Sequence, residues 1–197
     1  MANHQQISDE ELLTRIREAG EGDLRPFEEL VRRYQKKVTT NCRYLSGSAD
    51  DAEDLAQEVF MKVYFGLAGF EGRSSFNTWV QRIKSNHCIN FVKKKRLSTV
   101  NLETPGVEAA SGVPPKAERE LEKEATKVRV GEVLLQMSET LRIPLVLRDM
   151  DGMAYDEIAE ELGIGLSAVK MRIKRGREEF RRLMSSADGG STADSQE

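Results

Sequence analysis

An acid-free basic segment is the part of the sequence best suited to contact nucleic acid. The 26 residues from Gly72 to Leu97 contain seven lysines and arginines and no aspartate or glutamate. Aromatic, amide and hydroxyl side chains stand among these bases. This mixture suits single-stranded DNA, because positive charge follows the phosphates, aromatic rings stack on unpaired bases and polar groups hydrogen-bond an exposed base edge. On a helix, Arg82, Asn86 and Lys93 share the polar edge beside Trp79, so they are the first candidates for such contacts.

Two aromatic residues and one histidine of this segment have competing interpretations. Phe76 begins an apolar stripe and favours a place in the protein core. Trp79 lies at the border of the apolar and polar faces, so packing in the core and stacking on a base stay equally open. His87 lies on the apolar stripe, and no metal-ligand spacing surrounds it. We therefore expect His87 to be a core residue, and we predict no metal or cofactor site.

The segment 155–177 has the pattern of a helix-turn-helix. Such a motif needs a small residue where its helices approach, here Ala159, and a glycine in the turn, here Gly163. It also needs apolar anchors on the second helix, and we expect Ser167 to cap that helix. A structural helical hairpin with a solvated basic face is the alternative. Val169, Ile173 and Phe180 share one side of the second helix, and the opposite side, open to a major groove, carries Ser167, Lys170, Met171, Lys174 and Arg177.

Charges of one sign are gathered in blocks along the chain. Residues 46–61 contain five acids and no lysine or arginine, and residues 155–162 contain four acids. Residues 168–182 contain seven bases against two glutamates. Blocks of opposite sign indicate that different helices face different partners, although solvated helix faces are the simpler interpretation. The formal net charge of −3 is therefore a cancellation of acidic and basic segments.

The composition excludes several classes of protein. The 197 residues are 39% hydrophobic and rich in helix-forming side chains, which predicts an all-α fold with a small core. No apolar run approaches the roughly 18 residues of a membrane span, and the polar N-terminus is unlike a signal peptide. Cys42 and Cys88 are 46 positions apart, which argues against a disulfide scaffold or a zinc site. We expect a cytoplasmic protein without membrane insertion.

Helical patterns divide the chain into two small domains. Four helices are expected in an N-terminal domain of residues 1–97, capped by Ser8, Asp23, Ser48 and Ser75. Residues 98–119 hold three of the five prolines and form a flexible linker. A C-terminal helix-turn-helix domain spans residues 120–184, and a disordered tail spans residues 185–197. The inward side chains of the second domain are expected to include Leu121, Ala125, Val128, Val133, Leu134 and Met137.

Three motifs carry a family resemblance. They are residues 51–64 (DAEDLAQEVFMKVY), residues 70–83 with their Phe-Asn-Thr-Trp string, and the helix-turn-helix at 155–177, in this order. In them the chain resembles the bacterial extracytoplasmic-function (ECF) sigma factors of the sigma-70 superfamily. The resemblance covers residues 8–97 and 120–184, and it implies an initiation factor of transcription and not an enzyme.

The resemblance implies specific partners for the N-terminal domain. The acidic helix would dock on the clamp helices of the largest subunit of core RNA polymerase. The candidate residues for this contact are Asp51, Asp54, Gln57, Glu58 and Met61. The basic segment would separate the strands of promoter DNA at the −10 element and hold a flipped base. The candidate residues for this second contact are Arg73, Phe76, Thr78, Trp79, Arg82, Asn86 and Lys93.

The C-terminal domain would read the −35 element and pack on the polymerase flap. Lys170, Met171, Lys174 and Arg175 would face bases, and Ser167, Arg172 and Arg177 would contact phosphates. About 20 linker residues extended at roughly 3.3 Å each reach about 65 Å, which is the scale between two promoter elements. An anti-sigma factor is a further expected partner, without a residue that identifies it.

Departures from the family pattern leave the promoter sequence open. Ser74, Ser75 and Asn77 lie in the base-reading loop, where members differ, so the −10 base is not named. The turn Gly165-Leu166-Ser167 and the apolar Met171 are unusual, so the −35 sequence is open as well. An ordinary helix-turn-helix regulator with an N-terminal sensor or oligomerisation domain is the alternative function. It explains residues 120–184 equally well and leaves the acidic and the acid-free segments unexplained.

Overall fold

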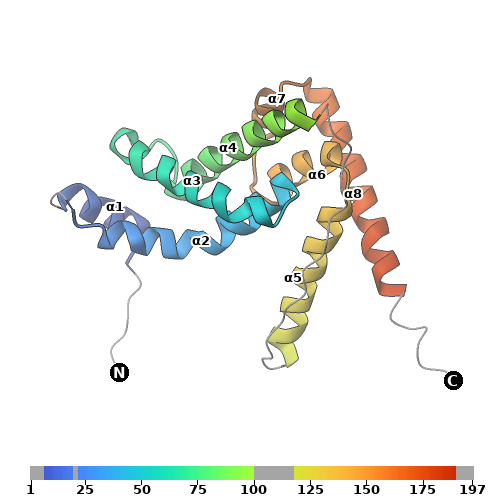
Figure 1. The fold of residues 1–197 in the computed structure, drawn as a ribbon, viewed down its shortest axis with the longest axis horizontal. Helices are drawn as coiled ribbons and strands as arrows, with labels where there is room; N and C mark the ends of the chain where they lie inside the picture. The colour runs from blue at the N-terminus through green and yellow to red at the C-terminus, as the bar shows by residue number, and fades with distance from the viewer. Residues whose placement is uncertain (1–6, 20–21, 100–117, 190–197) are drawn as a thin grey trace. The chain divides into compact units, whose positions relative to one another are not determined.

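The computed structural model describes residues 7–19, 22–99 and 118–189, and its regular elements in these ranges are all helical (Figure 1). The predicted all-α fold is therefore confirmed. The elements are α1 (Asp9–Glu18), α2 (Arg25–Ser46), α3 (Asp50–Gly66), the 3₁₀ turn η1 (Leu67–Gly69), α4 (Phe76–Thr99), α5 (Glu118–Gln136), α6 (Glu139–Leu145), the π turn η2 (Val146–Met150), α7 (Tyr155–Leu162) and α8 (Leu166–Gly189).

The chain divides into two compact units. The first contains residues up to Arg43 and residues 49–90, which include α1, α3 and most of α2 and α4. The second contains residues 44–48 and the chain from Phe91 onward, which includes α5 to α8. The division falls inside α4, before the predicted end of the N-terminal domain at residue 97. No helix in the described part of the chain is long and apolar enough to cross a bilayer.

Side-chain caps explain where some of the helices begin. The Ser8 hydroxyl accepts a hydrogen bond from the Glu11 amide at 3.1 Å, and the Ser75 hydroxyl accepts one from the Thr78 amide at 3.2 Å. Both caps were predicted, and both satisfy an amide that has no partner inside its helix. The predicted cap Asp23 lies one position too early, because α2 begins at Arg25, although its carboxylate accepts a hydrogen bond from the Arg25 amide at 3.2 Å.

Two other predicted caps are wrong by one or two positions. Helix α3 begins at Asp50, with Ala49 at its N-cap in place of Ser48. Helix α8 begins at Leu166, so Ser167 lies within its first turn and does not precede it. A serine caps a helix only from the position directly before the first helical residue. The acidic first turn of α3, with Asp50, Asp51 and Glu53, supplies the favourable charge at this helix end.

The core of the first unit is built mainly from α2, α3 and α4. Its fully buried side chains include Leu30 and Val38 of α2, Val59 and Val63 of α3, and Val80 of α4. Cys42 of α2 and Cys88 of α4 are also buried, with 3.5 Å between their sulfur atoms and no disulfide bond. They act here as small apolar side chains.

The buried face of α4 differs from the predicted stripe. His87, which we expected in the core, is only half-buried, as are the apolar Ile83 and Phe91 at helical spacing from it, whereas Lys84 and Ser85 are completely buried. The Lys84 ammonium donates a hydrogen bond to the Gln81 side-chain oxygen at 2.7 Å. Lys84 was counted among the bases of the acid-free segment, but its burial removes it from the DNA-accessible charge.

Helices α5, α6, α7 and α8 enclose the core of the second unit. Its buried side chains include Val133, Leu134, Met137, Leu147, Ile158, Val169 and Ile173. Ala125 and Val128, which were expected to point inward, are exposed on α5. Gly176 lets α8 approach α6 closely, because a Cβ atom at this position would lie 3.1 Å from the Leu141 carbonyl oxygen. This close approach accounts for a glycine in the middle of a helix.

Two predicted irregular segments are shorter than expected. Helix α4 runs to Thr99 and α5 begins at Glu118, so two residues at each end of the predicted linker are helical. Helix α8 continues to Gly189, beyond the predicted start of the tail at Ser185. The rest of the linker, residues 100–117, and the rest of the tail, residues 190–197, lie outside the described residues.

Candidate polymerase and nucleic-acid interfaces

Four aromatic rings pack together next to the loop that precedes α4. We call this cluster of Tyr34, Phe70, Phe76 and Trp79 the aromatic floor. The ring centroid of Phe70 lies 4.9 Å from that of Trp79 and 5.9 Å from that of Phe76. Tyr34 of α2 meets Phe76 edge to face at 5.5 Å. Phe76 is only 4% exposed, so its ring is part of the packed cluster. Trp79 is half-buried, which leaves part of its ring at the surface.

Gly66 at the end of α3 makes room for Trp79. A Cβ atom at residue 66 would lie 3.1 Å from Cζ2 of the Trp79 ring, closer than carbon atoms normally approach. The indole therefore packs directly against the α3 backbone. Sequence reasoning left the role of Trp79 open between packing and stacking, and this contact fixes the packed side of the ring.

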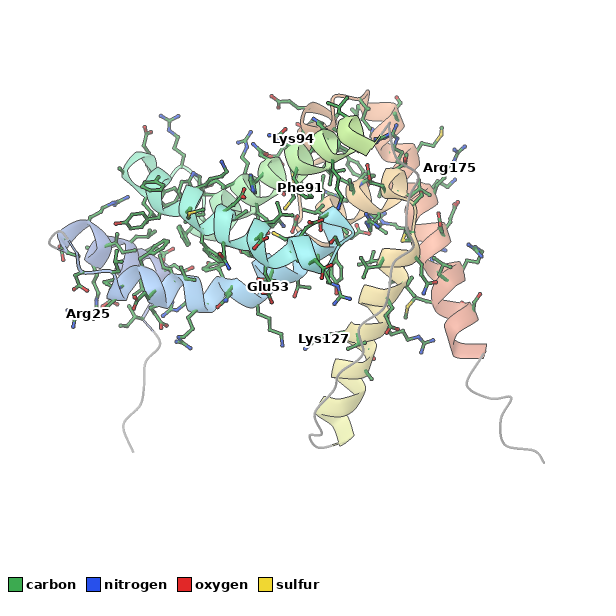
Figure 2. The ribbon with its side chains drawn as sticks, in the orientation of Figure 1. Arg25, Glu53, Phe91, Lys94, Lys127 and Arg175 are labelled. Atoms are coloured by element: carbon green, nitrogen blue, oxygen red, sulfur yellow. The ribbon has the colours of Figure 1, made fainter. Side chains whose placement is uncertain are left out.

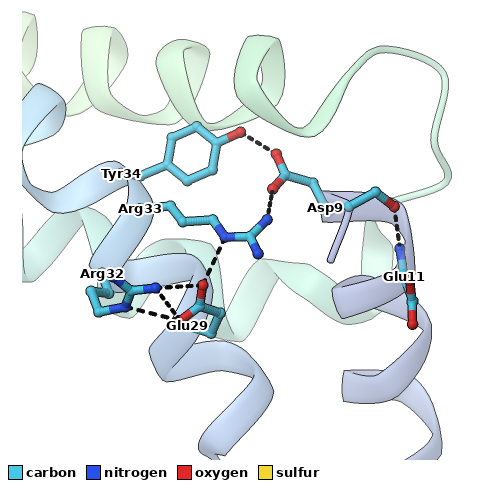
Figure 3. Close-up of polar contacts among 7 residues, drawn as sticks. Asp9, Glu11, Glu29, Arg32, Arg33 and Tyr34 are labelled. Carbon is cyan, nitrogen blue, oxygen red and sulfur yellow. Dashed lines mark hydrogen bonds and ion pairs between the residues drawn. The ribbon is translucent and has the colours of Figure 1, made fainter. Parts of the chain in front are cut away.

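Helix α1 contacts α2 through the Asp9 carboxylate, which meets Tyr34 and Arg33 (Figure 3), and it contacts the loop before α4 through Arg17. The Asp9 carboxylate accepts hydrogen bonds from the Tyr34 hydroxyl and from the Arg33 guanidinium, the latter at 3.0 Å. Burial and the bond to Asp9 raise the pKa of the Tyr34 hydroxyl above its ordinary value. Arg33 also donates to Glu29 at 2.9 Å, and Arg17 of α1 donates to the Phe70 carbonyl oxygen at 2.9 Å.

The polar candidate residues lie on the same loop and helix as Phe76 and Trp79, and most of them are open to solvent. Arg73, Thr78 and Arg82 are exposed, and Asn86 is half-buried. The Thr78 hydroxyl lies 2.9 Å from the Ser75 hydroxyl, and Arg73 pairs with Glu71 at 2.5 Å. Lys93 is exposed as well, but it lies beyond Asn90 in the other unit. The structure thus brings six of the seven predicted residues into one unit, with Phe76 below the surface.

Helix α3 presents the predicted acidic candidates to solvent. Asp54, Gln57 and Glu58 are exposed, Asp51 is half-buried, and Met61 is 55% exposed. The Glu58 carboxylate also lies 2.7 Å from Nε2 of His87 on α4. His87, which we expected in the core, is half-buried and contacts this carboxylate at the edge of the core. This contact ties the acidic helix to the helix that carries the basic segment.

A groove between α2 and α3 was missed by sequence reasoning. Its volume is about 860 Å³, and Arg32, Lys36 and Glu53 stand among its polar lining residues. Phe27 and Val31 line it, which explains why these two apolar residues of α2, on the same helical face as the buried Leu30, are only half-buried. Phe65 is 79% exposed beside it. The sequence did contain a signal for this groove. Four large apolar residues lie close together near the end of α3, and they occupy a wider face than a single inward stripe does: Phe60, Met61, Tyr64 and Phe65.

The helix-turn-helix has the predicted local geometry. Gly163 has a φ of +67°, in the left-handed region that favours glycine, and the Ile164 amide bonds to the Ala159 carbonyl at 3.1 Å. Val169 and Ile173 are buried as anchors. The opposite face of α8 is open to solvent, as Figure 2 shows at Arg175. Its exposed residues are Ser167, Lys170, Met171, Lys174, Arg175 and Arg177, and Arg172 is half-buried.

One ion pair, one cation–π contact and one hydrogen bond to the backbone attach η2 to the helix-turn-helix. Arg177 of α8 donates two hydrogen bonds to Asp149, with Nε–Oδ2 at 2.8 Å and Nη2–Oδ1 at 2.5 Å. The guanidinium of Arg148 lies 4.6 Å from the centroid of the Tyr155 ring, and its Nη1 donates to the Met153 carbonyl at 2.6 Å. The hydrogen bond to Asp149 raises the pKa of the Arg177 guanidinium above its ordinary value.

The chain is similar to known proteins over most of its length. Residues 30–97 match the family model for sigma-70 region 2, and residues 127–180 match that for sigma-70 region 4. The chain is 33% identical to the ECF RNA polymerase sigma factor SigW of Bacillus subtilis, over 86% of this chain and 95% of that protein. It is 31% identical to the ECF RNA polymerase sigma-E factor of Escherichia coli K12, over 88% and 93%.

Two solved structures share the fold. One is CnrH in complex with the cytosolic domain of CnrY, with a TM-score of 0.53 and 22% identity over 90% of this chain and 97% of that chain. The other is the sigma factor RpoE of Bartonella quintana in complex with the anti-sigma factor NepR, with a TM-score of 0.59 and 21% identity over 81% and 96%.

Proposed function

The chain belongs to the ECF RNA polymerase sigma factors of the sigma-70 superfamily, and from this premise we propose how its surfaces divide the work of initiation. In this proposal α3 binds core polymerase, the loop before α4 and α4 itself bind the −10 element, and α8 binds the −35 element. The protein directs polymerase to promoters and catalyses no reaction itself. It works in the cytoplasm, where transcription takes place.

The contact with core polymerase is assigned to α3 and the neighbouring groove. Asp54 and Glu58 give this face its negative charge, Gln57 adds a neutral amide, and Met61 adds an exposed apolar side chain next to the groove. A partner helix with basic and apolar side chains satisfies both features, because opposite charges orient the encounter and apolar burial supplies affinity. We assign this partner as the clamp helices of the largest polymerase subunit.

The −10 element is assigned to the surface above the aromatic floor. Arg73 and Arg82 supply positive charge for the backbone of a separated strand, and Thr78 and Asn86 supply donors and acceptors for a base edge. The exposed part of Trp79 can stack on a base while its other side stays packed on Gly66. Phe76 supports this surface from below, and Lys93 extends the basic segment toward the end of α4.

The −35 element is assigned to the exposed face of α8. Lys170, Met171, Lys174 and Arg175 are placed to meet base edges in the major groove, and Ser167 and Arg172 to meet phosphates. The second unit would also pack on the polymerase flap. The helix-turn-helix regulator is not favoured as an alternative, because the chain matches sigma-70 region 2 as well as region 4.

We further propose that an anti-sigma factor holds this protein inactive. The solved RpoE structure is a complex with the anti-sigma factor NepR, and CnrH is in complex with the cytosolic domain of CnrY. The exposed apolar residues beside the α2–α3 groove, Leu24, Met61, Tyr64 and Phe65, support a protein partner of this kind.

The assignment of the polymerase contact to α3 rests on the exposed acidic residues of this helix. Reversing the charge of one of them tests the assignment. Asp54→Lys is expected to abolish co-elution with purified core polymerase in gel filtration, because it places a base opposite a basic partner. Glu18→Lys, at an exposed acid of α1, is the matched control and should co-elute like the unmodified protein. Equal co-elution of both variants would contradict the assignment of α3.

A further inference from the structure

The ion pair between Asp149 and Arg177 changes the role expected for Arg177. The family resemblance placed Arg177 among the phosphate contacts of α8. In the structure one edge of its guanidinium, formed by Nε and Nη2, is engaged by both oxygens of one carboxylate. This two-bond geometry fixes the orientation of the guanidinium more strictly than a single contact does.

Two consecutive residues of η2 reach two different helices of the motif. Arg148 holds the chain just before α7, through the Met153 carbonyl and the Tyr155 ring. Asp149 holds the middle of α8 through Arg177. Neighbouring residues of a helix point about 100° apart, so a single turn can support two elements at once. Both helices of the helix-turn-helix are thereby anchored to the same turn, η2.

We propose that Asp149 is a positioning residue for DNA recognition, which sets the rotation of α8 by holding Arg177. The proposal rests on the proposed function of α8 as the −35 reader. Arg177 then contributes to binding through α8 and not through a phosphate contact. Its neighbours Lys174 and Arg175 carry the direct contacts, and their reach into the groove depends on how α8 is rotated.

A carboxylate beside a DNA-binding helix makes the proposal sharply testable. If Asp149 had no positioning role, its negative charge would only repel the phosphates, and Asp149→Asn would strengthen DNA binding. The same variant would release Arg177 to contact a phosphate, which again strengthens binding. The positioning role predicts the opposite sign, because the neutral amide cannot hold the guanidinium as an ion pair.

The test measures the affinity of the complex between the full chain and core polymerase for a 40-base-pair DNA duplex. This duplex is first selected by letting the same complex enrich binding sequences from a randomised pool. Asp149→Asn is expected to bind about five-fold more weakly, the loss that corresponds to about 1 kcal/mol. Arg177→Ala is expected to show the same loss with an unchanged dependence of affinity on salt. The double variant should bind no more weakly than either single variant, because both remove one interaction.

Two controls separate positioning from charge and from folding. Glu160→Gln removes an exposed acid of α7 and should leave the affinity unchanged or slightly higher. The exchange Asp149→Arg with Arg177→Asp restores an ion pair in reverse and should recover most of the affinity. Far-ultraviolet circular dichroism and co-elution with core polymerase confirm that each variant is folded.

Three results would overturn the proposal. One is tighter or unchanged binding by Asp149→Asn. Another is a salt slope that falls by about one unit for Arg177→Ala, the mark of a lost phosphate contact. The third is no enrichment of any duplex by the unmodified complex, which would overturn the proposed −35 role of α8 and this inference with it. The first two leave the proposed −35 role intact.

Discussion

Arg17 of α1 donates a hydrogen bond from Nη2 to the carbonyl oxygen of Phe70 at 2.9 Å, across 53 positions of sequence. Phe70 is the first residue after η1, where the loop toward α4 begins, and its ring is part of the aromatic floor. The first helix is thereby attached to the backbone of the segment that we assign to the −10 element. The attachment of Asp9 to Tyr34 and Arg33 gives α1 a second anchor on α2.

Arg17→Ala is expected to impair the opening of promoter DNA more than it impairs folding. A hydrogen bond to a charged group contributes about 1.5–3 kcal/mol where it is desolvated, and this partly buried one contributes toward the lower end. The measurement is permanganate reactivity of thymines in the −10 region, beside the urea midpoint of unfolding. Arg15→Ala, which removes only an exposed pair with Glu11, is the matched control. Identical promoter opening by both variants would show that α1 does not position the loop.

Gly66→Ala is expected to displace the indole of Trp79. The added Cβ would lie 3.1 Å from Cζ2 of the ring, so the side chain must shift by a few tenths of an ångström. Trp79 is the only tryptophan of the chain, so the emission maximum and acrylamide quenching of its fluorescence report this shift directly. Gly69→Ala is the control, because a Cβ there meets no atom within 4 Å. Spectra that change equally in both variants would contradict the contact.

Gly163→Ala is expected to destabilise the second unit by about 1–2 kcal/mol, because Gly163 has a left-handed backbone that a Cβ atom disfavours. Gly163→Asn should cost less, since asparagine tolerates this conformation better than alanine does. The denaturant midpoint, followed by circular dichroism, measures both effects. Gly165→Ala, in the same turn without a positive φ, should unfold close to the unmodified protein. A larger loss at residue 165 than at residue 163 would refute this explanation of the turn.

Lys170→Ala is expected to change promoter choice without changing core binding. Lys170 is exposed on the face of α8 that we assign to base edges, and its truncation should cost about 1–3 kcal/mol at one base pair of the −35 element. The test sequences the duplexes that the variant complex enriches from a randomised pool. Uniform weakening over all sequences, with a smaller salt slope, would make Lys170 a phosphate contact instead.

The helix-turn-helix was predictable because its requirements are local. Gly163 had to adopt a left-handed backbone, and Val169 and Ile173 had to face inward at helical spacing, and the structure shows both. The caps at Ser8 and Ser75 were predictable for the same reason, since each depends on residues three positions apart. Such features depend little on the rest of the fold.

Features set by packing between distant segments were not predictable from pattern alone. Lys84 is buried although its charge suggests exposure, and the contact of His87 with Glu58 joins two helices 29 positions apart. The apolar residues Phe27 and Val31 fit a core stripe, yet they line the groove between α2 and α3. The family resemblance suggested a phosphate contact for Arg177. The ion pair of Arg177 with Asp149, 28 positions earlier, forms only when the unit is folded. Each outcome depends on which helix is the neighbour, and a helical period does not contain that information.

Transcription in vitro tests the central claim most directly. The purified chain is added to core polymerase on fragmented genomic DNA of the bacterium that carries the gene, and the 5′ ends of the transcripts are sequenced. The account predicts a small set of discrete start sites that require both components, each preceded by shared −10 and −35 elements. Transcripts whose start sites are the same with and without the chain, or a chain that represses polymerase already carrying another sigma factor and never initiates, would contradict it.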